Sequence, residues 1–263
     1  WRLVRWRTCR QLLRTGWPAG VQICNDIFSW NLGVIFLSGL HKPANRVAAT
    51  IAMRYLGLSF MPAVGIGMAT SALVGRAIGQ GDHDLARHRA HRALALTGAY
   101  MGVCAVLFVL LRGPMIDLFL RKMPLAMDPA RVAELAPQVR AAGNVIFLCA
   151  AAFQLFDAIA IIYIGALRGA GDTLWPMAAT IASSWLIILG GGTLLALAFP
   201  GRAAGPWIAA SIYVFALGIL MFWRFESGAW RKIDLLTRRR RRVPPPIPLD
   251  VPVPDEPGDP ARP

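Results

Sequence analysis

Charged side chains are scarce in this sequence of 263 residues: Asp, Glu, Lys and Arg make up only 16% of it, whereas 56% is hydrophobic. Soluble domains carry about 25% charged residues, so this composition excludes an ordinary soluble fold. The mean hydropathy is +0.50. Apolar residues in such excess must face lipid or one another, which indicates an integral membrane protein.

The sequence also lacks the motifs of metal, nucleotide and enzyme sites. Its four cysteines show neither a CxxC pair nor the spacing of a zinc site. No Walker sequence occurs, and the glycine pair at 65 and 67 is not followed by the third glycine of a dinucleotide-binding fingerprint. We therefore expect a protein that is not an enzyme and that binds no organic cofactor.

Acidic residues are few, 14 against 28 Lys and Arg, which leaves a formal net charge of +14. In a soluble protein this excess would indicate a nucleic-acid partner. Here the arginines flank apolar segments, where they act as topology signals, and no basic patch is interleaved with stacking aromatic residues. The expected partner is the lipid bilayer, with no nucleic acid, and the five arginines at 238–242 suit anionic headgroups.

Six segments are apolar over about 20 residues, the length at which a helix crosses a hydrocarbon core of roughly 30 Å. They do not alternate as the strands of a barrel do. The sequence therefore predicts an all-α integral membrane protein with six transmembrane helices. The predicted spans are 17–39, 47–75, 93–111, 141–167, 174–199 and 206–223.

The regions outside the spans complete the predicted domain organisation. We expect a basic cytoplasmic linker over 1–16, a six-helix membrane lobe over 17–224, a basic cytoplasmic segment over 225–242 and a disordered proline-rich tail over 243–263. With the N-terminus inside, the inner segments hold 18 Lys and Arg and the outer segments hold 8. This bias predicts a multi-pass protein of the cell inner membrane or plasma membrane with both termini in the cytoplasm.

Two features of the loops predict local structure. Asp128 before Pro129 is typical of a helix start, so we expect a short surface helix that leads into the fourth span. The segments 79–82 (GQGD) and 169–172 (GAGD) repeat one pattern where the second and fourth spans end. In both, glycine is expected to provide the tight helix exit and the aspartate to cap the next helix; the alternative is a moving hinge.

Three ionisable residues lie well inside the predicted spans, namely Asp26, Arg54 and Asp157. A charge at the centre of a bilayer costs about 2.5 to 3.5 kcal/mol on insertion scales, so each of them requires a reason. Asp26 and Asp157 both lie about 15 Å from the inner boundary, near the midplane. Two carboxylates at one depth on different helices could share a proton or a Na⁺ ion. For Arg54, which could reach toward the interface or pair with a carboxylate, we expect a structural role.

Polar residues accompany each carboxylate at helical spacing and are expected to support it. An alternative is that the amides simply satisfy a structural aspartate. The expected supporting residues are Gln22, Asn25, Asn31, Gln154 and Tyr163.

Several motifs together resemble the C-terminal half of multidrug and toxic compound extrusion (MATE) transporters, over about residues 15–235. In the second predicted span these are PAVGIGMATSALVG at 62–75, IGQGD at 78–82 and Ala86. In the later part they are LRGAGDT at 167–173, Pro176-Met177, Trp185 and GPWIA at 205–209. The resemblance implies the second of two six-helix lobes in a twelve-helix carrier.

The resemblance also assigns roles to residues. Asp26 matches an acidic residue on the family's seventh helix, where glutamate is usual, and Asp157, within QLFDA at 154–158, matches an aspartate on the tenth. In part of the family these residues bind the coupling Na⁺ or proton. The implied function is efflux of amphipathic or cationic organic compounds by H⁺ or Na⁺ antiport, with the N-terminal lobe as a partner that this chain lacks.

Two other functions compete with efflux. One is a flippase of lipid-linked saccharides from the same superfamily, in which several basic residues should line the cleft for the pyrophosphate. The other is a non-functional fragment or a scaffold that does not transport, which fits a chain with only one lobe. Of these, the single intramembrane arginine favours efflux over the flippase.

Overall fold

Helices make up the fold, and the residues that the computed structural model describes, 6–122 and 129–232, contain no strand. The predicted all-α architecture is confirmed. In chain order the elements are α1 (Trp6–Ser29), π-helix η1 (Trp30–Phe36), α2 (Pro43–Gly79), α3 (His83–Leu110), α4 (Arg112–Lys122), α5 (Pro129–Gly169), α6 (Leu174–Ser183), π-helix η3 (Ser184–Gly191), α7 (Gly192–Ala198), α8 (Ala204–Glu226) and 3-10 helix η4 (Ala229–Lys232).

Five helical stretches of the described residues are long and apolar enough to cross a membrane: 43–79, 83–110, 132–169, 174–198 and 204–226. They correspond to the second to sixth predicted spans. The first predicted span is also helical, as α1 continued by η1, but it is not among the five. Polar residues interrupt its apolar run, and they include Asp26.

Helix α1 includes part of the predicted linker. It is described from Trp6, and the predicted start of the membrane lobe at residue 17 lies within it. Hydropathy marks where a chain enters lipid and not where a helix starts, so the predicted boundary stays a prediction. The proline-rich tail at 243–263 and most of the basic segment at 225–242 lie outside the described residues, so these boundaries stay predictions.

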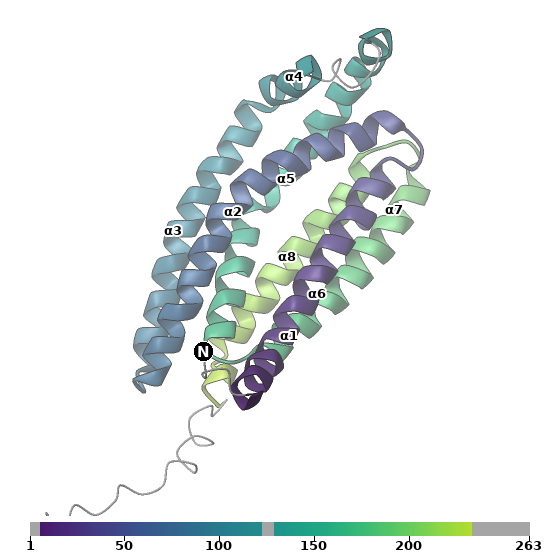
Figure 1. Ribbon diagram of the computed structural model, residues 1–263. Helices are drawn as coiled ribbons and strands as arrows, with labels where there is room; N and C mark the ends of the chain where they lie inside the picture. Colours follow the sequence, from purple (N-terminus) through teal and green to yellow (C-terminus); the bar gives the residue numbers. More distant parts are fainter. Residues whose placement is uncertain (1–5, 123–128, 233–263) are drawn as a thin grey trace, which may run out of the picture. The chain divides into compact units, whose positions relative to one another are not determined.

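Helix α5 is central to the bundle, because it contacts α2, α3, α4 and α8. Helices α2 and α3 lie together on one side, while α1, α6, α7 and α8 form the other side (Figure 1). Within this second group α1 packs against α6 and η3, and α7 packs against α8. The main hydrophobic cluster contains buried residues from both groups and joins them.

Glycines allow α2 and α5 to pack backbone to backbone. A Cβ atom on Gly165 of α5 would overlap the carbonyl oxygen of Gly67 in α2, and one on Gly169 would overlap that of Ser71. Small residues at a four-residue spacing permit this close approach between helices in a membrane. The contact fixes the position of α5, on which Asp157 lies.

The fourth span begins earlier than expected and without a separate surface helix. Helix α5 is described from Pro129 and runs unbroken through Pro137 to Gly169. The prediction of a distinct short helix between 129 and 141 is therefore wrong, because the span helix extends outward by about three turns. A separate short helix does occur, but as α4 at 112–122. Asp128 lies outside the described residues.

The two GxGD segments form the same turn. Gly81 and Gly171 adopt positive φ angles of 81° and 84°, and the next residue, Asp82 or Asp172, donates its backbone N–H to the carbonyl five residues earlier, at 3.0 and 2.9 Å respectively. This is the Schellman helix ending, in which glycine takes the left-handed position. The predicted glycine exits are confirmed.

The two aspartates of these turns differ in role. The Asp82 carboxylate accepts the Leu85 N–H at 2.8 Å and so caps α3, as predicted. The Asp172 carboxylate does not cap α6; it accepts a hydrogen bond from Nε of Arg224 at 2.9 Å. The capping prediction is therefore wrong for Asp172, because an arginine of α8 stands within reach of the turn.

Candidate functional site

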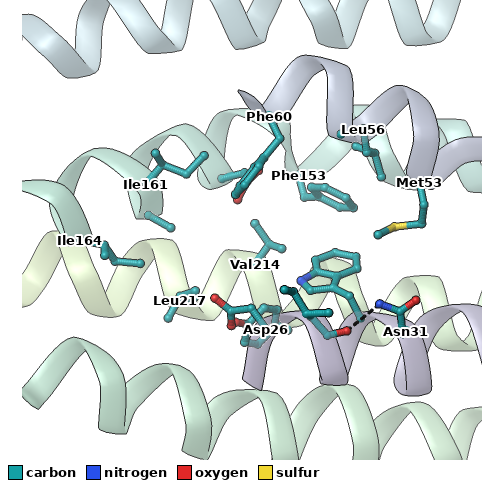
Figure 2. A pocket seen from close by; sticks show the side chains of 16 residues that line it. Asp26, Asn31, Met53, Leu56, Phe60, Phe153, Ile161, Ile164, Val214 and Leu217 are labelled. Carbon is teal, nitrogen blue, oxygen red and sulfur yellow. Dashed lines mark hydrogen bonds between the residues drawn. The ribbon is translucent and has the colours of Figure 1, made fainter. Parts of the chain in front are cut away.

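A cavity of about 300 Å³ opens between α1, η1, α2, α5 and α8. In Figure 2, Asp26 lies on the wall formed by α1, and Leu56 and Phe60 of α2 lie on the opposite wall. Apolar and aromatic side chains supply most of the lining. The lining residues are Asp26, Ile27, Trp30, Asn31, Met53, Leu56, Gly57, Phe60, Phe153, Asp157, Ala160, Ile161, Ile164, Tyr213, Val214 and Leu217.

Asp26 and Asp157 reach this cavity from two different helices. They are the acidic residues of its lining, and the charge of Asp26 acts on Asp157. The Oδ1 atom of Asp26 is buried without a hydrogen-bond partner. Two carboxylates in apolar surroundings repel one another unless a proton or a cation neutralises one of them. The orphaned oxygen and the paired carboxylates fit a bound proton or Na⁺.

The polar residues that precede Asp26 face α6 and η3. Gln22 is buried and donates from Nε2 to Oγ1 of Thr180 at 2.9 Å. Asn25 donates to Oγ of Ser184 at 2.9 Å. Neither residue lines the cavity. They hold α1 against α6 and η3, and in this way they set the position of Asp26.

The other three predicted supporting residues are more dispersed. Asn31 lines the cavity, but its amide donates to the carbonyl of Ile27 in its own helix at 2.8 Å (Figure 2). Gln154 is buried and donates to Oγ of Ser59 in α2 at 3.1 Å, away from the cavity. Tyr163 donates to Glu226 at 3.4 Å. Of the five, the structure brings only Asn31 into the cavity with the carboxylates.

Arg54, the third intramembrane ionisable residue, is exposed on α2 and does not line the cavity. The structural role expected for it stays a prediction. The cavity lining contains no Lys or Arg.

Two residues near the carboxylates were not predicted. Tyr213 of α8 lines the cavity, and both aspartates act on it electrostatically. Arg168 of α5 acts on Asp26 and donates from Nη2 to Oε1 of Gln22 at 2.7 Å. The sequence offered a signal for Arg168, because it lies in the LRGAGDT motif, but a basic residue at a span end was interpreted only as a topology signal.

A second polar cluster joins three helices at the end of the lobe where α1 starts. Glu226 of α8 forms an ion pair with Arg87 of α3 and lies 2.6 Å from Nε2 of His91 on the next turn of the same helix. The same carboxylate accepts the hydrogen bond from Tyr163 of α5. This cluster ties α3, α5 and α8 together and lies apart from the cavity.

The apolar helices of the bundle, which surround a carboxylate-lined cavity, define a multi-pass membrane protein. A model of the MatE family matches residues 18–191, and the chain belongs to this family. The resemblance to MATE transporters is therefore confirmed.

Curated relatives support the assignment. The chain is 29% identical over 239 residues to a probable multidrug resistance protein NorM of Thermotoga maritima, covering 90% of this chain and 48% of the relative. It is 31% identical over 227 residues to the probable NorM of Xanthomonas campestris, covering 86% and 46%. The chain thus spans about half the length of the curated relatives it matches.

Two solved structures share the fold. A multidrug resistance MATE family transporter in an outward-facing conformation superposes with a TM-score of 0.66 at 20% identity, covering 89% of this chain and 48% of that one. A MOP superfamily transporter from Pyrococcus furiosus superposes with a TM-score of 0.63 at 20% identity, covering 82% and 44%. The two superpositions show a fold common to one half of such transporters.

Proposed function

We propose that this chain is the C-terminal lobe of an efflux carrier in the cell membrane, with both termini in the cytoplasm. The carrier exports amphipathic or cationic organic compounds in exchange for H⁺ or Na⁺. It is a transporter and not an enzyme, and its only cofactor is the coupling ion. Its two other partners are the organic substrate and an N-terminal lobe.

One observation carries the proposal: Asp26 of α1 and Asp157 of α5 line the same apolar cavity. In such surroundings a carboxylate pair binds one cation and releases it when a competing cation arrives. Antiport requires this alternation between the ion and a cationic substrate. The aromatic side chains of Trp30 and Phe153 on the cavity wall suit organic cations, because ring faces attract positive charge.

The cavity lining also distinguishes efflux from the flippase alternative. A site for a lipid-linked pyrophosphate needs basic side chains, and the residues that line this cavity include two carboxylates and no Lys or Arg. The sign of the charge therefore favours a cationic substrate.

The test is drug transport in everted membrane vesicles under an imposed H⁺ or Na⁺ gradient, where efflux by the carrier is measured as drug uptake into the vesicles. Asp157→Asn should abolish gradient-driven efflux while the protein still inserts, because the amide keeps the shape of the side chain but cannot exchange a charge. Asp26→Asn should do the same. Asp84→Asn is the matched control, since Asp84 is exposed on α3 outside the cavity. Normal gradient-driven efflux in both single variants would contradict the proposal.

A further inference from the structure

A stripe of side chains on α5 connects the cavity to the end of the lobe where α1 starts. Asp157, Ile161, Ile164 and Arg168 follow one another at spacings of four, three and four residues, which places them on one face of the helix. The first three line the cavity. Arg168 is therefore the next residue of the cavity face, about three turns from Asp157.

The guanidinium of Arg168 is hydrogen-bonded to a residue of α1. Its Nη2 donates to Oε1 of Gln22 at 2.7 Å, and Gln22 is itself anchored by its bond to Thr180 at 2.9 Å. Gln22 is only 2% exposed, so this anchor has little freedom to move. The buried amide thus fixes a positive charge at one position beside α1.

That position is close to Asp26. Gln22 precedes Asp26 by four residues, so the two side chains are neighbours on α1, with Cβ atoms about 6 Å apart. The charge of Arg168 acts on Asp26, yet no ion pair joins the two residues. The arginine therefore influences the carboxylate through space, and the Oδ1 atom of Asp26 stays without a hydrogen-bond partner and available to a ligand.

We propose that Arg168 is a positioning residue that sets the cation affinity of Asp26: it is a fixed internal cation that weakens the hold of the carboxylate on any incoming cation. This assignment rests on the proposed function, since it concerns the same cation site. A like charge near the site lowers the affinity for a cation, which allows the ion or substrate to leave. A carrier that binds too tightly would not release its cargo.

Other groups facing Asp26 do not supply this effect. Besides Arg168, the ionisable groups that share an electrostatic interaction with Asp26 in the described part of the chain include Asp157 of α5 and Tyr213 of α8, on both of which Asp26 acts. A second carboxylate strengthens cation binding, and a phenol is neutral. The side chains that face α1 from α6 and η3 include the hydroxyls of Thr180 and Ser184, which carry no charge.

The test measures equilibrium binding of the lipophilic cation tetraphenylphosphonium to the protein in lipid nanodiscs at pH 9, where protons compete least for the carboxylates. Arg168→Gln should bind the probe roughly tenfold more tightly than the wild type, because the repelling charge is gone. Arg168→Lys, which keeps the charge, should stay near the wild-type affinity. If Arg168→Gln does not fold, Arg168→Met, which retains much of the side-chain stem, should show the same gain.

A matched control and a double variant separate electrostatics from structure. Arg76 lies exposed in the last turn of α2, so Arg76→Gln removes the same charge away from the cavity and should leave the affinity unchanged. In an Asp26→Asn background the Arg168→Gln substitution should give no gain. A merely structural Arg168 would instead weaken binding when replaced, and unchanged or weaker binding in the folded neutral variants overturns the assignment.

The two proposals can fail separately. If Asp26→Asn weakens binding of tetraphenylphosphonium while Arg168→Gln leaves it unchanged, the cation site stands and only the role of Arg168 is refuted. If the wild type does not bind the probe, or binds it as well as Asp26→Asn does, the proposed function is refuted together with the role of Arg168.

Discussion

Asp172, in the turn after α5, and Arg224, in the last turn of α8, form an ion pair at 2.9 Å. The side chain of Asp172 is 6% exposed and that of Arg224 is 23% exposed, so the pair is largely removed from water. The guanidinium also lies over the ring of Trp175, 5.2 Å from its centroid. The pair thus joins the α5–α6 connection to α8.

Asp172→Ala should lower the free energy of unfolding by about 2 kcal/mol or more, because it leaves a mostly buried arginine without its partner. Asp82→Ala is the control, since it removes only the cap of α3 in the equivalent turn and should cost about 1 kcal/mol. Thermal unfolding in detergent gives the comparison. Equal losses in the two variants would show that the ion pair adds nothing beyond a helix cap.

The glycine contact between α2 and α5 leads to a second prediction. Gly165→Ala should destabilise the lobe by about 1 to 3 kcal/mol, because the added methyl group overlaps the carbonyl of Gly67 and forces the helices apart. Gly65→Ala is the control, since nothing lies within 4 Å of its added Cβ atom. The control should be neutral or slightly stabilising. A Gly165→Ala variant as stable as Gly65→Ala would contradict the close approach.

Hydrophobic run length predicted most of this fold. Five of the six predicted spans are among the long apolar helices, since an uninterrupted apolar stretch such as 206–223 has few structural alternatives in lipid. The helix ends were less predictable. Helix α5 extends outward beyond the predicted span boundary at residue 141, because backbone hydrogen bonds continue the helix and hydropathy is insensitive to them.

The site was predictable in part for a similar reason. An intramembrane carboxylate is rare enough to stand out, so Asp26 and Asp157 could be identified without a structure. Their neighbours could not, because helical spacing shows which residues share a face but not which helix that face meets. Gln154 forms a hydrogen bond with Ser59 of α2, and Gln22 forms hydrogen bonds with Arg168 and Thr180. In each case the two partners are far apart in the sequence.

The orientation in the membrane provides a third prediction, motivated by the excess of Lys and Arg at the ends assigned to the cytoplasm. In a background without the four native cysteines, Ser227→Cys, just after α8, should react with an impermeant thiol reagent only from the cytoplasmic side. Pro200→Cys, between α7 and α8, should react only from outside. Both residues are exposed. The reverse pattern would invert the topology.

The central claim is that Asp26 and Asp157 act as one cation site. If so, the two substitutions are not additive, because the loss of one carboxylate already destroys the shared site. The direct measurement is gradient-driven drug efflux in vesicles for Asp26→Asn, Asp157→Asn and the double variant, normalised to the amount of inserted protein. We predict that the double variant shows the same residual efflux as the more severe single variant. In both of these variants the efflux should be close to zero. Near-normal gradient-driven efflux in the double variant would contradict the account.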